Sequence, residues 1–302
     1  MSDKQASVCV IGGACYDIFG NSEATIIPAD SNPGKITAAC GGVGRNIAGD
    51  LALLGVPVEL ICGLGNDDNG QKIKEHCNAI GIGLRHSLIC NLPTAVYLSL
   101  NQPSGEIYGA VGDMRINEAL DPTYLAGCLD FINSCAVAVL DTNLAAEACD
   151  FLCENVTAKL FVDTVSAAKA GKLRGQLKKI RVLKTNLLEA CALLGQDCQP
   201  EEAVSLLRQK GIAEVYLTLG AQGVCCSGGE QGLRLNNYPS EVINTTGCGD
   251  AFMAGVIYGE LRNADLVGKA RYGLAAAAIC CRSMGSYCEY LSESELLRIV
   301  TG

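Results

Sequence analysis

The sequence predicts an α/β protein with a doubly wound, mainly parallel sheet that is flanked by helices and accompanied by a small additional β-sheet. Two observations predict this fold class. Short, continuously apolar runs alternate with helix-length amphipathic segments along most of the 302 residues, as in βαβ units whose strands are buried on both faces. Two other segments, about 14–40 and 94–112, alternate apolar and polar residues in the manner of antiparallel strands.

Six apolar runs are expected to form the parallel strands, and the amphipathic segments between them are expected to form helices. The strands are predicted at residues 7–13, 58–65, 136–143, 159–165, 181–186 and 214–220. The helices are predicted at residues 44–55, 69–81, 121–134, 144–155, 167–179, 187–195 and 200–211. After residue 244 the chain reads as wholly helical, with an alanine-rich segment at 270–281.

The two antiparallel segments contain no helical pattern, and turns are predicted in them at 31–34 and 102–105. We therefore expect one domain over residues 1–302, with a small sheet that projects from it and serves as a lid. The exposed strand edges of such a sheet can pair with a second copy of the chain. A homodimer through the lid is the expected assembly.

Composition and charge disfavour several classes of protein. The net charge is −9 without a basic cluster, which argues against nucleic-acid binding. No apolar run is long enough for a membrane span, and the opening MSDKQASVCVIGG lacks a signal-peptide pattern, so a cytoplasmic protein with a small-molecule ligand is expected. The eighteen cysteines are expected to be reduced and buried, because a chain of this length can form a core without disulfides.

Polar and glycine residues follow the ends of the predicted strands. In open α/β sheets, ligands bind beyond the carboxyl ends of the strands, so these residues should meet at one edge. Their chemistry suggests a polyhydroxylated ligand together with a phosphate. The residues are Asp17, Asp141, Asn143, those from Asp163 to Ser166, Asn186, Thr218 and Gly220.

The stretch NTTGCGDAFMAG at 244–255 leads from glycines into a predicted helix. Gly247 and Gly249 allow successive backbone N–H groups to converge on one anion, and the helix N-terminus adds partial positive charge. Asp250 would then be an ionised general base beside the charge that develops in a reaction. The alternative is that Asp250 only caps the helix and that the glycines only form a turn.

A second glycine-rich motif, CGGVGRN at 40–46, precedes the helix predicted at 44–55. The Walker A and GxGxxG dinucleotide patterns are absent from the sequence. Together, GGVGRN and TTGCGD resemble the motifs of the ribokinase-like family of sugar and nucleoside kinases, also called PfkB-type carbohydrate kinases, and the resemblance runs along the whole chain. It is supported by GGACYD (12–17), GLGNDDNG (63–70), KTNLLE (184–189) and LTLGAQG (217–223).

The resemblance implies a central sheet flanked by helices, a β-sheet lid, and ATP-dependent phosphorylation of a hydroxyl group with Mg²⁺ and a possible K⁺. Several stretches look most like those of family members that phosphorylate the 5′-hydroxyl of pseudouridine. Alternatives are a kinase of ribose or of another nucleoside, and a non-catalytic nucleoside-binding sensor. The stretches are DSNPG (30–34), GGVGRNIA (41–48), DMRI (113–116), FVDTVS (161–166), VINTTG (242–247) and CEY (288–290).

The resemblance also implies a role for individual residues. Asp250 would be the base, with the backbone of Gly247, Cys248 and Gly249 as the anion hole. The substrate would contact Asp17, Gly42, Arg45, Asn46, Tyr97, Ser99, Asp113, Asn143, Asp163, Ser166 and Lys169. ATP would contact Asn186, Glu189, Thr218, Gly220, Gly223 and Thr246, and a monovalent cation would contact Asn244 and Thr246.

Structural alternatives accompany several of these assignments. Arg45 could brace the lid, Tyr97 could belong to the lid core, Lys169 could be a solvated helix residue, and Glu189 could be an exposed first-turn residue. The sequence departs from the family pattern at two positions. Cys248 stands where the family usually has Ala, and Asn244 stands where it often has Asp.

Overall fold

The computed structural model describes residues 7–228, 232–283, 285, 288 and 290–302. Its main feature is an eight-stranded sheet with the order β14-β13-β12-β11-β10-β9-β1-β4. The six predicted strands are parallel neighbours in it, which confirms the doubly wound fold. They are β1 (Val8–Ile11), β4 (Val58–Ile61), β9 (Val137–Asp141), β10 (Lys159–Asp163), β11 (Val182–Asn186) and β12 (Glu214–Thr218).

Two antiparallel strands that the sequence analysis did not predict extend this sheet, β13 (Val224–Ser227) and β14 (Leu233–Leu235). At the other end, β1 lies between β4 and β9. After β1, the chain therefore forms β4 on one side of β1 and later forms β9 on the other side. Such a switch point opens a crevice beyond the carboxyl ends of the strands.

Helices cover both faces of the large sheet, because alternate strand residues point to opposite sides. Val8 and Val10 belong to one core cluster, whereas Cys9 and Ile11 belong to the other. The first cluster is covered by α1 (Val43–Leu53), α2 (Asp68–Ile80), α8 (Cys248–Leu261), α9 (Leu266–Cys280) and α10 (Glu293–Thr301). The second is covered by α3 (Pro122–Ser134), α4 (Ala146–Asn155), α5 (Ala167–Ala170), α6 (Leu187–Leu194) and α7 (Pro200–Gln209).

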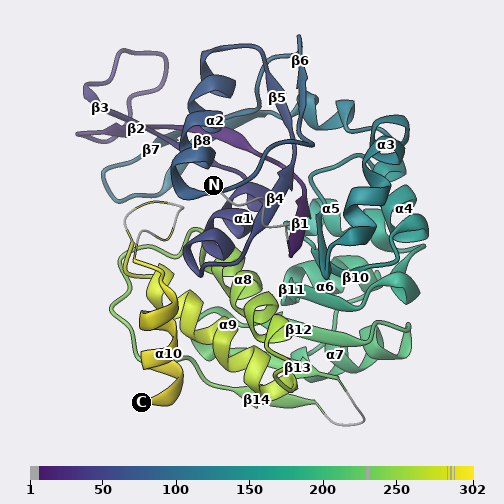
Figure 1. Ribbon diagram of the computed structural model, residues 1–302. Helices are drawn as coiled ribbons and strands as arrows, with labels where there is room; N and C mark the ends of the chain where they lie inside the picture. The colour runs from purple at the N-terminus through teal and green to yellow at the C-terminus, as the bar shows by residue number, and fades with distance from the viewer. Residues whose placement is uncertain (1–6, 229–231, 284, 286–287, 289) are drawn as a thin grey trace.

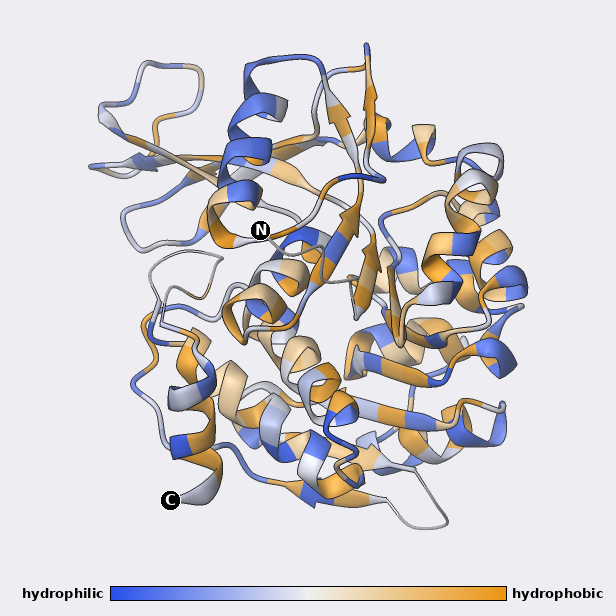
Figure 2. Ribbon diagram, viewed as in Figure 1, coloured by the Kyte–Doolittle hydropathy of each residue, from blue (hydrophilic) through white to orange (hydrophobic). Residues whose placement is uncertain are grey.

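Hydropathy follows this layering (Figure 2). Hydrophobic residues dominate the large sheet, while α2 is largely hydrophilic and buries only Gly70, Ile73 and Cys77. Asp67 caps α2 by accepting a hydrogen bond from the N–H of Gly70. A narrow apolar stripe is what a surface helix of this kind needs.

The helix predicted at 167–179 is wrong in extent. Only α5 is α-helical, and the rest consists of two 3₁₀ turns, Gly171–Leu173 and Leu177–Lys179. Glycines at 171 and 175 interrupt the segment, and each destabilises a helix interior by about 1 kcal/mol relative to Ala. Leu173 and Leu177 in these turns are nevertheless buried.

A second, four-stranded sheet projects from the main body (Figure 1). It consists of β2 (Cys15–Ser22), β3 (Gly34–Gly41), β7 (Val96–Asn101) and β8 (Ile107–Asp113) in the order β3-β2-β7-β8. Its central pair, β2 and β7, is parallel rather than antiparallel. We call it the projecting sheet. A further pair, β5 (Gly63–Gly65) and β6 (Leu88–Cys90), lies apart from it.

The eighteen cysteines are free thiols, and most are buried, as expected. None of the helices within the described ranges combines the length and the apolar character that a membrane crossing requires.

Candidate active site

The two glycine-rich motifs meet in space at Asp250. This residue lies in the first turn of α8 and is only 7% exposed. Its Oδ2 accepts a 2.8 Å hydrogen bond from Nδ2 of Asn46 in α1. The N-cap position of α8 is Gly247, which has no side chain to cap the helix. The Asp250 carboxyl group is therefore directed toward α1 and the sheet edge.

The environment of Asp250 suits a proton acceptor. Burial raises the pKa of its carboxyl group to about 7, and the nearby Asp163 and Asp141 carboxylates act in the same direction. The Lys184 ammonium group and the Asn46 hydrogen bond oppose this shift in the pKa. A general base works best when its pKa lies near the working pH.

Backbone geometry at the start of α8 leaves N–H groups facing outward. Gly247 has a φ of 82°, in the left-handed region that favours glycine. The first N–H groups of any helix lack intrahelical acceptors, and that of Cys248 makes only a 3.3 Å bond to the carbonyl of Thr245. This turn therefore offers the donors and the partial positive charge that bind an anion.

Three predicted substrate residues share one face of the projecting sheet. Asp17 pairs with Tyr97 in the register of β2 and β7, and Ser99 pairs with Phe19 on the same face. Asp17 is buried and accepts a 2.9 Å hydrogen bond from the Cys15 thiol, and burial raises the pKa of its carboxyl group.

Gly41 and Gly42 bring the first glycine-rich motif close to this region. A Cβ on Gly41 would lie 2.0 Å from Oδ2 of Asp17, so any side chain there would displace the carboxyl group. Gly42 has a φ of 98°, and a Cβ on it would lie 2.5 Å from the carbonyl oxygen of Gly13. Both glycines are required for the close approach of the Asp17 strand and the start of α1.

A second group of predicted residues lies beyond β9 and β10. Nζ of Lys169 donates a 2.6 Å hydrogen bond to Oδ1 of Asn143, and burial lowers the pKa of this lysine. The interpretation of Lys169 as a solvated helix residue is therefore wrong. Ser166 precedes α5 without capping it through its side chain.

Asp163 is fully buried. Oδ1 accepts a 2.8 Å hydrogen bond from the N–H of Val165, and Oδ2 lies 3.0 Å from Nζ of Lys184. Val165 has a φ of 59°, which is an outlier for a β-branched residue. Such strain concentrates at functional sites, and Asp163 stabilises it here.

The predicted nucleotide residues lie along the ends of β11 and β12. Asn186 and Glu189 form a capping box at the start of α6, with Oδ1 of Asn186 2.9 Å from the N–H of Glu189. Glu189 is only 4% exposed, so its interpretation as an exposed first-turn residue is wrong. Thr218 is the register partner of Asn186. Gly220 and Gly223 follow it with positive φ angles.

Asn244 shapes the turn that precedes α8. Its Oδ1 accepts a 2.9 Å hydrogen bond from the N–H of Thr246, and its Nδ2 lies 3.4 Å from the carbonyl oxygen of Gly285. Within the described residues, no group of three or more His, Cys, Asp or Glu side chains is arranged to hold a metal ion.

Comparison with known proteins identifies the family. Residues 5–290 match the profile of the pfkB family carbohydrate kinases. The chain belongs to this family. Pseudouridine kinase of Escherichia coli is 37% identical over 297 residues, which cover 96% of this chain and 93% of that protein.

Two solved structures share the fold of this chain. A carbohydrate kinase from Agrobacterium tumefaciens superposes with a TM-score of 0.86 at 27% identity, covering 98% of this chain and 97% of that one. Ribokinase of Arabidopsis thaliana, complexed with ribose and ATP, has a TM-score of 0.90 at 21% identity, covering 99% and 100%. As a pfkB family member, the protein is a phosphotransferase with an alcohol group as acceptor, as its two motifs predicted.

Two residues in the predicted substrate set lie apart from the shared face. Asp113 pairs in register with Val96, so its side chain lies on the face opposite to Tyr97, and it forms a 2.6 Å ion pair with Arg115. Arg45 is fully buried and donates a hydrogen bond to the carbonyl of Cys40. The structure does not bring Asp113 together with Asp17.

Lys184 is a residue of the site that the sequence analysis did not assign. It lies in β11, is almost fully buried, and pairs with Asp163. Burial alone would lower its pKa, but the Asp163, Asp250 and Glu189 carboxylates raise it above the usual value. Its Nζ lies 2.8 Å from the position of a Cβ on Gly249, so the ammonium group occupies the space beside the first turn of α8.

Asp141 was expected at this edge as a strand-end residue, but it had no individual role in the sequence analysis. Its Oδ2 accepts hydrogen bonds from the N–H groups of Gly13, at 2.9 Å, and Gly44, at 2.8 Å, and Oδ1 accepts one from Asn143. It therefore fastens the end of β1 and the start of α1 to β9. A charged residue within an apolar strand, as at Asp141 and Lys184, was the available signal, because such a group is rarely buried without partners.

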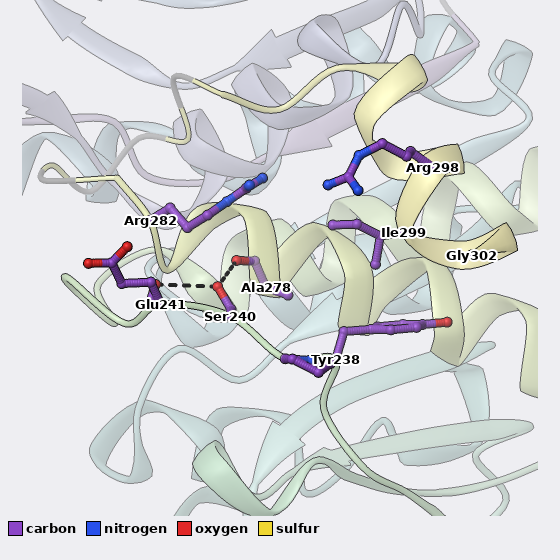
Figure 3. Close-up of a pocket in the computed structure, with 9 residues that line it drawn as sticks. Tyr238, Ser240, Glu241, Ala278, Arg282, Arg298, Ile299 and Gly302 are labelled. Atoms are coloured by element: carbon purple, nitrogen blue, oxygen red, sulfur yellow. Dashed lines mark hydrogen bonds between the residues drawn. The ribbon is translucent and has the colours of Figure 1, made fainter.

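Two hollows among the described residues differ in their relation to the predicted site. One of about 680 Å³ is lined by Asn143 and Lys172 together with the turn at 114–118. The other, of about 370 Å³, lies between the 238–241 loop, α9 and α10, and contains none of the predicted catalytic or substrate residues. Figure 3 shows the second hollow, which is lined by Arg282, two residues after the end of α9, and by Arg298 of α10.

Proposed function

We propose that this protein transfers the γ-phosphoryl group of ATP to the 5′-hydroxyl of pseudouridine, giving pseudouridine 5′-phosphate and ADP. The observation that carries the proposal is the buried Asp250, whose pKa is about 7, held by Asn46 at the N-terminal turn of α8. The 37% identity to the pseudouridine kinase of Escherichia coli supports the choice of substrate.

Asp250 accepts the proton of the 5′-hydroxyl while the hydroxyl oxygen attacks the γ-phosphorus. The bond from the γ-phosphorus to the bridging oxygen breaks, and ADP leaves with the electron pair. Charge on the transferring group is stabilised by the first-turn N–H groups of Gly247, Cys248 and Gly249. Lys184, beside Gly249, adds a full positive charge. Phosphoryl transfer depends mainly on such positioning and charge stabilisation.

On the substrate side, Asp17 and Asn46 bind ribose hydroxyls near Gly42, and Tyr97 and Ser99 cover the sugar. Asn143, whose orientation is fixed by Lys169, contacts the base. A C-linked uracil carries one N–H more than the N-linked base of uridine. The Ser166 hydroxyl, which does not cap α5, is the acceptor that we assign to this N–H.

On the nucleotide side, Asn186, Glu189, Thr218, Gly220 and Gly223 border ATP. Mg²⁺ usually binds through one or two carboxylates and substrate phosphates, and it keeps several waters, rather than sitting in a dedicated cage, so Asn186 and Glu189 are suited to hold, through water, an ion that arrives with ATP. Asn244 and Thr246 would contact a potassium ion. It would add positive charge near the γ-phosphate.

We assign the projecting sheet as the lid over the substrate. The face opposite to Tyr97 is apolar, and it exposes Ile36, Leu98, Leu100 and Val111. An exposed apolar face of this kind marks an interaction site, so we propose a homodimer through the lid. An enzyme that acts on a free nucleoside and ATP would operate in the cytoplasm.

An ADP-release assay over a panel of nucleosides and sugars tests the function. Pseudouridine should give the highest kcat/KM, with uridine, ribose and fructose well below it. Higher turnover of ribose or of another nucleoside would replace the substrate assignment while leaving the phosphotransferase class intact. Saturable pseudouridine binding without any ADP release would indicate a sensor.

A further inference from the structure

Two thiols meet beside the N-terminus of α8. Sγ of Cys248 lies 2.9 Å from Sγ of Cys281. Cys248 is the first residue of α8, and Cys281 is the C-cap of α9. A disulfide requires an S–S distance of about 2.0 Å, so an approach of less than about 1 Å would join the pair.

The backbone around this pair is already held in place. The N–H groups of Ile243 and Asn244 donate to the carbonyl of Cys281 at 2.8 and 3.2 Å. In Figure 3, the Ser240 hydroxyl donates to the carbonyl of Ala278, a bond of 2.6 Å. The loop that leads into α8 is therefore fastened to the end of α9, which keeps the two thiols close together.

Exposure distinguishes this pair from the thiols around it. Cys248 and Cys281 are both partly exposed, whereas the neighbouring Cys280 and Cys288 are buried. Oxidation of cysteine depends on access as well as on chemistry. A small oxidant can therefore reach Cys248 and Cys281 while the thiols beneath them are shielded.

We propose that Cys248 and Cys281 form an oxidation site, at which a peroxide produces an intramolecular disulfide that switches phosphoryl transfer off. Only the effect on activity rests on the proposed function, because Cys248 belongs to the anion hole there. The formation of the bond depends on the thiol geometry alone.

The chemistry balances with hydrogen peroxide as the oxidant. The Cys248 sulfur attacks one peroxide oxygen, the O–O bond breaks, and one water leaves together with the former thiol proton, giving a sulfenic acid. The Cys281 sulfur then attacks Sγ of Cys248. The S–O bond breaks, and the hydroxide takes the Cys281 proton and leaves as a second water. Two thiols are oxidised and one peroxide is reduced, and a dithiol such as dithiothreitol reverses the change.

The bond would disturb the anion hole directly. Cys248 lies between Gly247 and Gly249, and the bond would draw it toward α9. A displacement of about 1 Å in a catalytic constellation can lower the rate about 100-fold. We therefore expect the oxidised protein to lose about 99% of its activity.

The test uses the full-length protein, reduced and then treated with hydrogen peroxide. Free thiols are alkylated under denaturing conditions, and the digest is examined by mass spectrometry beside an ADP-release assay. A linked peptide containing Cys248 and Cys281 should form in parallel with the loss of activity, and dithiothreitol should reverse both. A linked peptide without loss of activity would overturn the switch, and a link from Cys248 to Cys280, or no link at all, would overturn the site.

Two variants separate this pair from the other cysteines. Cys281→Ser should form no such link. At the same peroxide dose, the activity that this variant loses should be at most about one tenth of the activity that the unmodified protein loses. The matched control is Cys191→Ser, which removes another close pair, because Sγ of Cys191 lies 3.5 Å from Sγ of Cys198. It should respond to peroxide like the unmodified protein. Equal inactivation of Cys281→Ser would contradict the proposal.

The same experiment separates the two proposals. A reduced protein that turns over no nucleoside or sugar would contradict the proposed function. The linked peptide would still report whether the oxidation site exists.

Discussion

Nδ2 of Asn46 donates a 2.8 Å hydrogen bond to Oδ2 of Asp250 across 204 residues of sequence. Both residues are buried. The bond joins the GGVGRN motif on α1 to the TTGCGD motif at the start of α8. It orients the carboxyl group that we propose as the base, and it explains why two distant motifs occur together in one chain.

Replacing Asp250 by Asn tests the base. The side chain keeps its size but can no longer accept the hydroxyl proton. Removal of a general base typically lowers the rate by about 10²–10⁴-fold, so kcat should fall within that range. Binding of ATP, measured by calorimetry, should change little. A fall in kcat of less than about tenfold, with chemistry still rate-limiting, would show that Asp250 is not the base.

The pH dependence of kcat/KM should report the pKa of Asp250. The base acts when ionised, and burial raises its pKa to about 7, so kcat/KM should increase as the pH rises through about 7 and then level off. Below that point it should fall about tenfold per pH unit. An acidic limb centred near the usual pKa of an aspartate would contradict the burial argument.

Replacing Lys184 by Met tests whether this lysine, which the sequence analysis did not assign, acts on Asp250. Because the ammonium group lowers the pKa of Asp250, its loss should move the midpoint of the pH profile to higher pH and also lower the plateau of kcat. The control is Lys172→Met, which removes a lysine that bonds the carbonyls of Thr142 and Leu144 instead and should leave the midpoint in place. An unshifted midpoint in Lys184→Met would limit this lysine to a structural role.

Potassium activation should be modest because of Asn244. An Asp at this position would offer a full negative charge, whereas the Asn oxygen offers only a dipole and already accepts a hydrogen bond from Thr246. Charge count tunes cation affinity at oxygen-lined sites, so Asn244→Asp should strengthen activation. Rates would be measured over a potassium titration with a large organic cation holding ionic strength constant. Near-complete dependence on potassium in the unmodified protein would contradict this account.

The sequence predicted the parts of the fold whose signals are local. Continuous apolar runs predicted all six parallel strands, but the two antiparallel strands β13 and β14 were missed because they have only 4 and 3 residues. The helix predicted at 167–179 does not extend so far, because Gly171 is the C-cap of α5 and a second glycine follows at 175.

The contacts of the site depend on which strands are neighbours. Lys184 meets Asp163 because β11 lies beside β10, and Asp141 reaches Gly13 and Gly44 because β9 lies beside β1. Strand order cannot be read from a single sequence, so Lys184 was not assigned, and Asp141 was expected at this edge without a role of its own. The two glycine-rich motifs, in contrast, could be recognised from the sequence alone, because their residues are consecutive in the chain.

The most direct test of the central claim is a comparison of kcat/KM for pseudouridine, uridine and ribose under identical conditions with saturating ATP and Mg²⁺. The account predicts the highest value for pseudouridine, because we assign the Ser166 hydroxyl as the acceptor of the additional N–H of the C-linked base. Equal or better turnover of ribose would contradict it.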